Sequence, residues 1–209
     1  MILLSDPRLP EVEVAECGEP LIDISSLSSV QLDTRERDEA GAYSRVRTGI
    51  GTRLEAASAY LPTGVHLRVI EGHRSVAEQA RRFAGYEERL CDSGLTGKQL
   101  YRQVSMFVSP VQVAPHCAGA AVDLTLADDD GRELDMGGPV NGHRYGQEQS
   151  CPWTADGLSS TARHHRDLLG AALTSVGFVN YPTEWWHWSY GDRYWAYISG
   201  AKAAIYGPV

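Results

Sequence analysis

The sequence predicts a single domain of the α+β class, for three reasons. Its 209 residues are enough to bury one core without disulfides or a structural metal. Segments with apolar residues at three- and four-residue steps occur in the same chain as short apolar, β-branched segments, so both helices and strands are expected. No internal repeat, linker or low-complexity tract divides the chain. We therefore expect one domain over residues 1–209.

In the first half of the chain, residues 1–33 place short apolar runs between Pro, Gly and Ser clusters, and we expect a peripheral, irregular arm. Helical periodicity predicts a helix over residues 43–60, which Pro62–Gly64 ends. A strand over residues 65–70 follows. Ser75, with Glu78 three residues later, has the pattern of a capping box. We therefore expect a helix through about Leu90 and a shorter one over residues 97–106.

In the second half, an apolar, β-branched segment predicts a strand over residues 120–126, and residues 133–136 are expected to return as the second arm of a hairpin. Residues 137–157, rich in Gly, Pro and polar side chains, should form a long loop, and such loops are commonly functional. Helical spacing predicts a helix over residues 161–176, closed by Gly177. Strands over residues 178–181 and 184–190 are expected to complete the sheet.

Charge and hydropathy exclude several classes of partner. The formal net charge of -8 argues against nucleic acid and anionic membranes, which require a basic face. No apolar run reaches the length of a membrane span, and the first residues have no basic segment followed by a long apolar one. We expect a cytoplasmic protein. Its four scattered cysteines form no C-x-x-C pair, which favours free thiols and leaves a disulfide as the alternative.

Two separated motifs suggest a metal site. Six residues separate His116 from Asp123, and Glu184 and His187 follow far downstream. Two imidazoles and one carboxylate are a ligand set of catalytic zinc, with a fourth position for water, and a nearby free carboxylate can take that water's proton. Side chains three apart in a regular strand point to opposite faces, so Glu184 and His187 can share a site only if the chain turns between them. The motifs therefore predict a zinc hydrolase.

The same residues carry a family resemblance. His116 and Asp123, then Glu184 and His187, match the H-x6-D and E-x-W-H signatures of the D-alanyl-D-alanine dipeptidase family, the VanX-like zinc peptidases. Residues 72–74 and 121–126 resemble its G-Y-R and A-I-D-L-T-L blocks, so the likeness covers roughly residues 40–195. It implies a small central, mainly antiparallel sheet flanked by helices. It also implies one zinc per chain and a small D-amino-acid dipeptide as the substrate.

The resemblance assigns roles and shows departures. It implies that Arg74 stabilises the oxyanion, as a fixed guanidinium can, and that Glu184 is the general base. His73 stands where the family has Tyr and is expected to line the pocket with Trp186. Asn141 aligns with the carboxylate that holds the substrate ammonium, and an amide binds a cation less well. Asp135 or Glu148 could substitute; otherwise the substrate has no free amine there.

Two other functions remain open on the sequence. A D,D-carboxypeptidase acting on longer cell-wall peptides would use the same chemistry but would need an open groove. A non-catalytic zinc-containing binding module would use the same ligands. Because binding alone requires neither Glu184 nor Arg74, the sequence favours an enzyme over a binding module.

Overall fold

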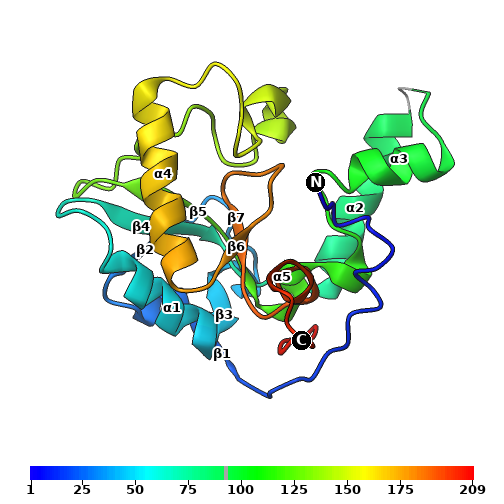
Figure 1. Cartoon of the computed structure of the whole chain (residues 1–209), viewed down its shortest axis with the longest axis horizontal. Coiled ribbons are helices and arrows are strands. Elements are labelled where there is room, and N and C mark those ends of the chain that lie inside the picture. The colour runs from blue at the N-terminus through cyan, green and yellow to red at the C-terminus, as the bar shows by residue number, and fades with distance from the viewer. Residues whose placement is uncertain (92–93) are drawn as a thin grey trace.

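A mixed five-stranded sheet forms the centre of the protein, whose computed structural model describes residues 1–91 and 94–209 (Figure 1). The strand order is β2-β4-β5-β7-β6; β2 and β4 are parallel, and the other neighbours are antiparallel. The strands are β2 Val30–Leu32, β4 His66–Glu71, β5 Ala121–Ala127, β6 Val179–Asn180 and β7 His187–Ser189. The predicted α+β class with a small, mainly antiparallel sheet is confirmed.

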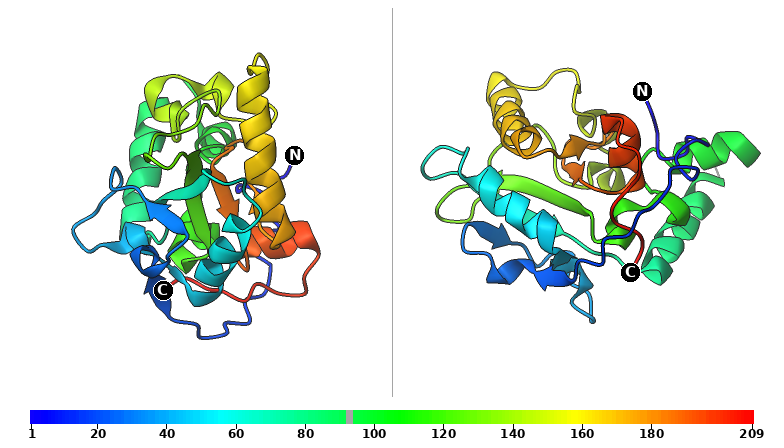
Figure 2. Two further views of the ribbon diagram at one scale, coloured as in Figure 1. Left: turned by 90° about the vertical axis from the view of Figure 1, so that its left-hand side faces the viewer. Right: turned by 60° about the horizontal axis from the view of Figure 1, so that its bottom comes forward.

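Helices lie on both sides of this sheet. α1 (Thr48–Ser58) and α4 (Ser160–Ser175) contact each other and the sheet, and the left view of Figure 2 shows the sheet between α4 and α2 (Val76–Cys91). α3 (Gly97–Val104) packs on α2, and α5 (Arg193–Ser199) contacts β6. The predicted helices α2, α3 and α4 are confirmed to within a few residues.

The central strand β5 is buried along its whole length and separates the core from the site. Val122, Leu124 and Leu126 belong to the main hydrophobic cluster. Because side chains alternate along a strand, Asp123 points to the other face. An apolar strand thereby holds one carboxylate in a fixed position with little conformational freedom.

The N-terminal residues are more ordered than the sequence suggested. Within residues 1–33, β1 (Leu21–Asp23) pairs with β3 (Arg45–Arg47), and β2 forms one edge of the central sheet. The helix predicted over residues 43–60 begins only at Thr48. Pairing of β3 with β1 takes the preceding residues into a strand, since cross-strand contacts override a local helical pattern.

Two other predictions are corrected in part, and one helix was not predicted. Residues 133–136 do return beside β5, but as an isolated antiparallel bridge between Ala127 and Glu133 rather than as a strand; the Leu134 amide donates to the Leu126 carbonyl. The strand predicted over residues 184–190 is limited to β7. Helix α5, whose first turn is capped by the Asp192 carboxylate, was not predicted.

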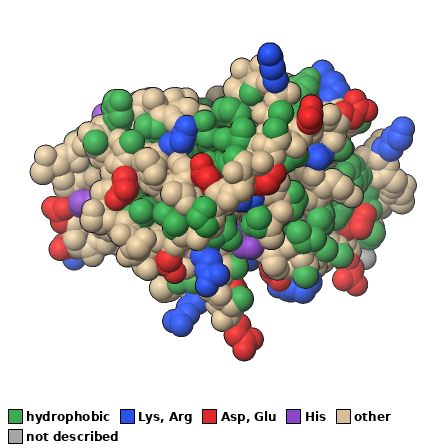
Figure 3. All heavy atoms as spheres, turned by 90° about the horizontal axis from the view of Figure 1, so that it is seen from below, with side chains coloured by type: hydrophobic (Ala, Val, Ile, Leu, Met, Phe, Trp, Pro, Cys, Tyr) green, Lys and Arg blue, Asp and Glu red, His purple; other side chains and the backbone are tan. Residues whose placement is uncertain are grey.

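No helix among the described residues is long and apolar enough to cross a membrane. On the face drawn in Figure 3, acidic and basic side chains are interspersed rather than gathered by sign.

Candidate metal centre and active site

Three side chains from separate elements converge at the edge of the central strand. His116 belongs to a short 3-10 helix, Pro115–Ala118, whereas Asp123 and His187 are paired neighbours on β5 and β7. Their possible ligand atoms all lie within 4.8 Å of one another. Oδ1 of Asp123 is 3.3 Å from Nε2 of His116 and 3.0 Å from Nδ1 of His187. A tetrahedral zinc with bonds of about 2.0–2.1 Å separates its ligands by roughly 3.3 Å, so these spacings fit that ion.

The electrostatics of the group also fit a cation. Burial by itself would raise the pKa of Asp123, but His116 and His187 hold it well below its usual value. Burial also lowers the pKa of His187, which favours the neutral imidazole that a metal requires. Nδ1 of His116 lies 2.6 Å from the Gly72 carbonyl, which fixes a proton on Nδ1 and leaves Nε2 as the ligand atom.

Glu184 is brought to the same place by a tight turn. Its amide donates to the Tyr181 carbonyl, and the His187 amide donates back to the Glu184 carbonyl at 3.2 Å. The turn puts Oε2 of Glu184 4.0 Å from Nδ1 of His187. It is the turn that the sequence analysis required if both side chains were to share one site. Burial, and then the charge of Asp123, raise the pKa of Glu184 well above its ordinary value.

Arg74 follows β4 and is held rigidly. Nε and Nη2 donate to the two oxygens of Glu71, at 2.9 and 2.5 Å, and Nη1 donates to Oε1 of Gln79 at 2.6 Å. Burial alone would raise the pKa of Glu71, but Arg74 lowers it to about 2. A guanidinium has five N–H groups, so two remain for another acceptor.

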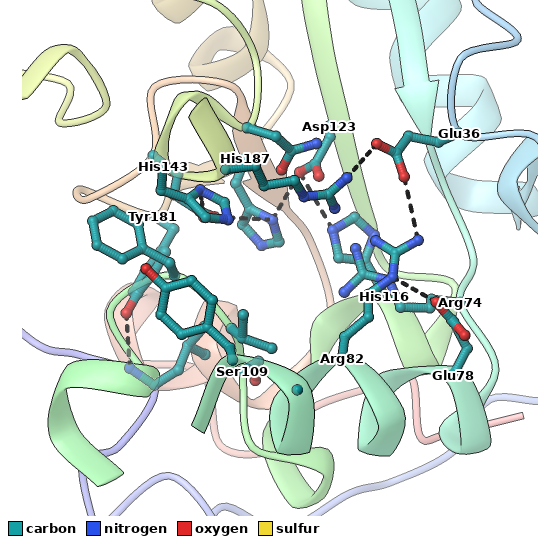
Figure 4. A pocket seen from close by; sticks show the side chains of 18 of the residues that line it. Glu36, Arg74, Glu78, Arg82, Ser109, His116, Asp123, His143, Tyr181 and His187 are labelled. Atoms are coloured by element: carbon teal, nitrogen blue, oxygen red, sulfur yellow. Dashed lines mark hydrogen bonds and ion pairs between the residues drawn. The ribbon is translucent and has the colours of Figure 1, made fainter. Parts of the chain in front are cut away.

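A cavity of about 430 Å³ unites these groups. Figure 4 shows His143 and Tyr181 on one side of it and Glu36, Arg74 and Arg82 on the other. Helix α2 supplies one wall, and the loop that contains Asn141 supplies another. The predicted site residues that line the cavity are Arg74, His116, Asp123, Asn141, Glu184 and His187.

Two residues that were predicted to contact the substrate do not line the cavity. In the described part of the chain, His73 is absent from the cavity lining, and its Nε2 lies 3.3 Å from the Val209 carbonyl. Trp186 is fully buried behind His143, with 6.1 Å between ring centroids. Neither Asp135 nor Glu148 lines the cavity, so neither stands in for the carboxylate that Asn141 lacks.

Several site residues were missed on the sequence. His143 lines the cavity, stacks on Phe107 with 4.9 Å between centroids, and places Nδ1 3.9 Å from Oε1 of Glu184. Its sequence neighbourhood contains no partner at ligand spacing, so no local signal marks it. Glu71, which orients Arg74, could have been found as an acid at the end of the strand that delivers the arginine.

Comparisons with known proteins show what the chain is similar to. The model of the peptidase M15 family, described as D-Ala-D-Ala dipeptidase, matches residues 49–199. A D-alanyl-D-alanine dipeptidase of Synechocystis sp. is 29% identical over 95% of each chain. One of Escherichia coli is 40% identical over 34% of this chain and 35% of its own. The LdcB LD-carboxypeptidase structure has a TM-score of 0.50 at 18% identity, covers 89% of this chain and 76% of that one, and supports the fold alone.

The family match spans most of the chain and contains every residue of the His116, Asp123 and His187 group. The chain therefore belongs to the D-Ala-D-Ala dipeptidase family and is a metallopeptidase.

Proposed function

We propose that this protein hydrolyses D-Ala-D-Ala or a closely related small dipeptide with one zinc ion held by His116, Asp123 and His187. The observation that carries the proposal is that this ligand group, a buried carboxylate and a fixed guanidinium border one cavity. The names of the relatives supply the substrate class.

The metal fits its donors in kind and in spacing. Bound there, zinc would polarise the scissile carbonyl and make a water molecule more acidic. The Gly72 carbonyl keeps the His116 ring in one orientation and one tautomer.

Each remaining residue has a chemical task. Glu184 accepts the proton of the attacking water and passes it to the leaving amine, and a pKa raised by burial suits a group that both takes and gives a proton. Arg74 uses the N–H groups that Glu71 and Gln79 leave free to stabilise the negative charge developing on the carbonyl oxygen. Because Arg74 is already oriented, little reorganisation is needed during the reaction.

The test combines metal analysis with activity. Metal-free protein should be inactive toward D-Ala-D-Ala, and one equivalent of zinc should restore its turnover, with L-Ala-L-Ala as the stereochemical control. His116→Ala should bind zinc much more weakly. Tight one-to-one zinc binding by His116→Ala, or no cleavage of D,D-dipeptides by the zinc-loaded protein, would overturn the assignment.

A further inference from the structure

Three charged side chains from distant segments form a bridge of ion pairs along one wall of the cavity. Nη1 of Arg144 donates to Oε1 of Glu36 at 2.6 Å, and Nη2 of Arg82 donates to Oε2 of the same carboxylate at 3.3 Å. Glu36 lies in the loop after β2, Arg82 on α2, and Arg144 in the 3-10 helix Gly142–Tyr145. All three line the cavity that contains the metal group.

The two arginines differ in how much of their binding capacity is used. All three guanidinium nitrogens of Arg82 already donate to carboxylates, those of Glu36, Glu71 and Glu78. Arg144 has one side-chain partner within the described residues, Glu36, and its side chain is 31% exposed. Nε and Nη2 of Arg144 are therefore available to a ligand in the cavity.

The surroundings of Arg144 favour an anion over a cation. Asn141, on the same turn, is neutral. His143 is neutral as well, since burial, followed by the charges of Arg144, Arg89 and Arg74, lowers its pKa to about 3. Of the carboxylates that line the cavity, Glu36 and Glu78 are each paired with arginines, and Asp123 and Glu184 belong to the reaction centre.

We propose that Arg144 forms a subsite for a carboxylate group of the substrate and that Glu36 is the counter-ion which holds the empty subsite in shape. The planar guanidinium can bind a carboxylate through two parallel hydrogen bonds. This inference rests on the proposed function for the substrate being a peptide. The carboxylate has two sources, the C-terminus of a dipeptide or an acidic N-acyl group on its first residue.

Four ligands separate the two sources: D-Ala-D-Ala, its C-terminal amide, N-acetyl-D-Ala-D-Ala and N-succinyl-D-Ala-D-Ala. Their dissociation constants are measured by calorimetry with the metal-free protein, and kcat/KM is measured separately with zinc. A subsite for the C-terminus makes the amide bind about tenfold more weakly than D-Ala-D-Ala. A subsite for an acyl carboxylate makes the succinyl compound bind about tenfold more tightly than the acetyl compound.

Three variants test whether the preference for a ligand carboxylate depends on this bridge of ion pairs. Arg144→Gln should abolish whichever tenfold difference the wild type shows, and Arg144→Lys should restore part of it, because it keeps the charge but not the planar fork. Glu36→Gln should strengthen binding of the same carboxylate, since it removes a competing acceptor. A purely structural bridge would instead weaken binding in both Arg144→Gln and Glu36→Gln.

Arg81→Gln is the matched control, because Arg81 also borders the cavity but is 75% exposed and makes both of its side-chain hydrogen bonds to Glu78. It should leave the tenfold difference unchanged. Equal binding of the four ligands, a preference that survives Arg144→Gln, or no binding at all would overturn the subsite. Because binding is measured without metal, loss of turnover with retained carboxylate preference would count against the proposed function alone.

Discussion

Glu184 is the residue whose environment is most closely matched to its proposed task. It is buried next to the ligand group without being part of it, and a turn rather than a strand directs its carboxylate into the cavity. A carboxylate in this position can exchange protons with water and with a leaving amine while the ligands remain in place.

We predict that Glu184→Gln keeps zinc and loses about 10²–10⁴-fold in kcat, because the amide retains the shape of the side chain but cannot act as a base. Zinc content by elemental analysis and kcat on D-Ala-D-Ala check this together. A variant that loses zinc while its remaining metal-bound fraction turns over at the normal rate would show that Glu184 has a structural role.

Glu71 is predicted to be a positioning residue for Arg74. Glu71→Gln would leave a buried guanidinium without its bidentate partner, and breaking a buried ion pair typically destabilises by about 3–5 kcal/mol. We expect a lower free energy of unfolding in urea together with a lower kcat. Glu78→Gln is the control, since it removes a more exposed acid, on α2, that also pairs with Arg82; equal losses in both variants would argue against a specific role for Glu71.

At the level of elements, the end of β4 sets the position of the site. The amide of Gly72 donates to the Tyr43 carbonyl, its carbonyl meets His116, and the Arg74 amide donates to the His116 carbonyl. A side chain at Gly72 would clash with the Arg45 carbonyl and with Val46. The close approach of these backbone segments therefore requires glycine.

Gly72→Ala should consequently destabilise the fold by about 1–3 kcal/mol and also weaken zinc binding, because the displaced segment carries the orienting carbonyl of His116. Thermal unfolding of the metal-free variant and zinc titration measure the two effects. Gly85→Ala on α2 is the matched control, since a Cβ there meets no atom within 4 Å. If Gly72→Ala bound zinc with unchanged affinity, the backbone packing around Gly72 would not control the geometry of the metal ligands, and the prediction would be wrong.

For the whole molecule, acid stability should depend on buried and paired carboxylates. Burial by itself would raise the pKa of Asp33, but hydrogen bonds and charge from Arg35, with the charge of Arg68, lower it. The pKa values of Asp38 and Glu71 are lowered as well. A carboxyl whose pKa is lower in the folded than in the unfolded state adds stability above its unfolded value, about 4, and loses this contribution as pH falls.

The free energy of unfolding of the metal-free protein should therefore decline from about pH 5 toward pH 2. Asp33→Asn should show a shallower decline than the wild type, because the Asn amide does not titrate. Urea denaturation at a series of pH values measures both slopes. Parallel curves for the two proteins would show that Asp33 does not contribute to the acid transition.

The sequence by itself determined the chemistry of the centre. The proposed ligands and the proposed base follow from two motifs, whereas the role proposed for Arg74 follows from the family resemblance of residues 72–74. The need for a turn before His187 follows from strand geometry alone. Helices α2, α3 and α4 were also predictable, because helical periodicity and caps are local signals.

The tertiary structure alone decided what surrounds that chemistry. Pairing of β1 with β3 replaced the start of a predicted helix, and His143 entered the cavity from a loop without periodicity. Glu36 and Arg144 are 108 residues apart and meet only when β2 and the 140s loop reach the same wall. Such contacts depend on the packing of distant segments, whose register no short stretch of sequence encodes, and so the shape and charge of the substrate pocket emerged only with the fold.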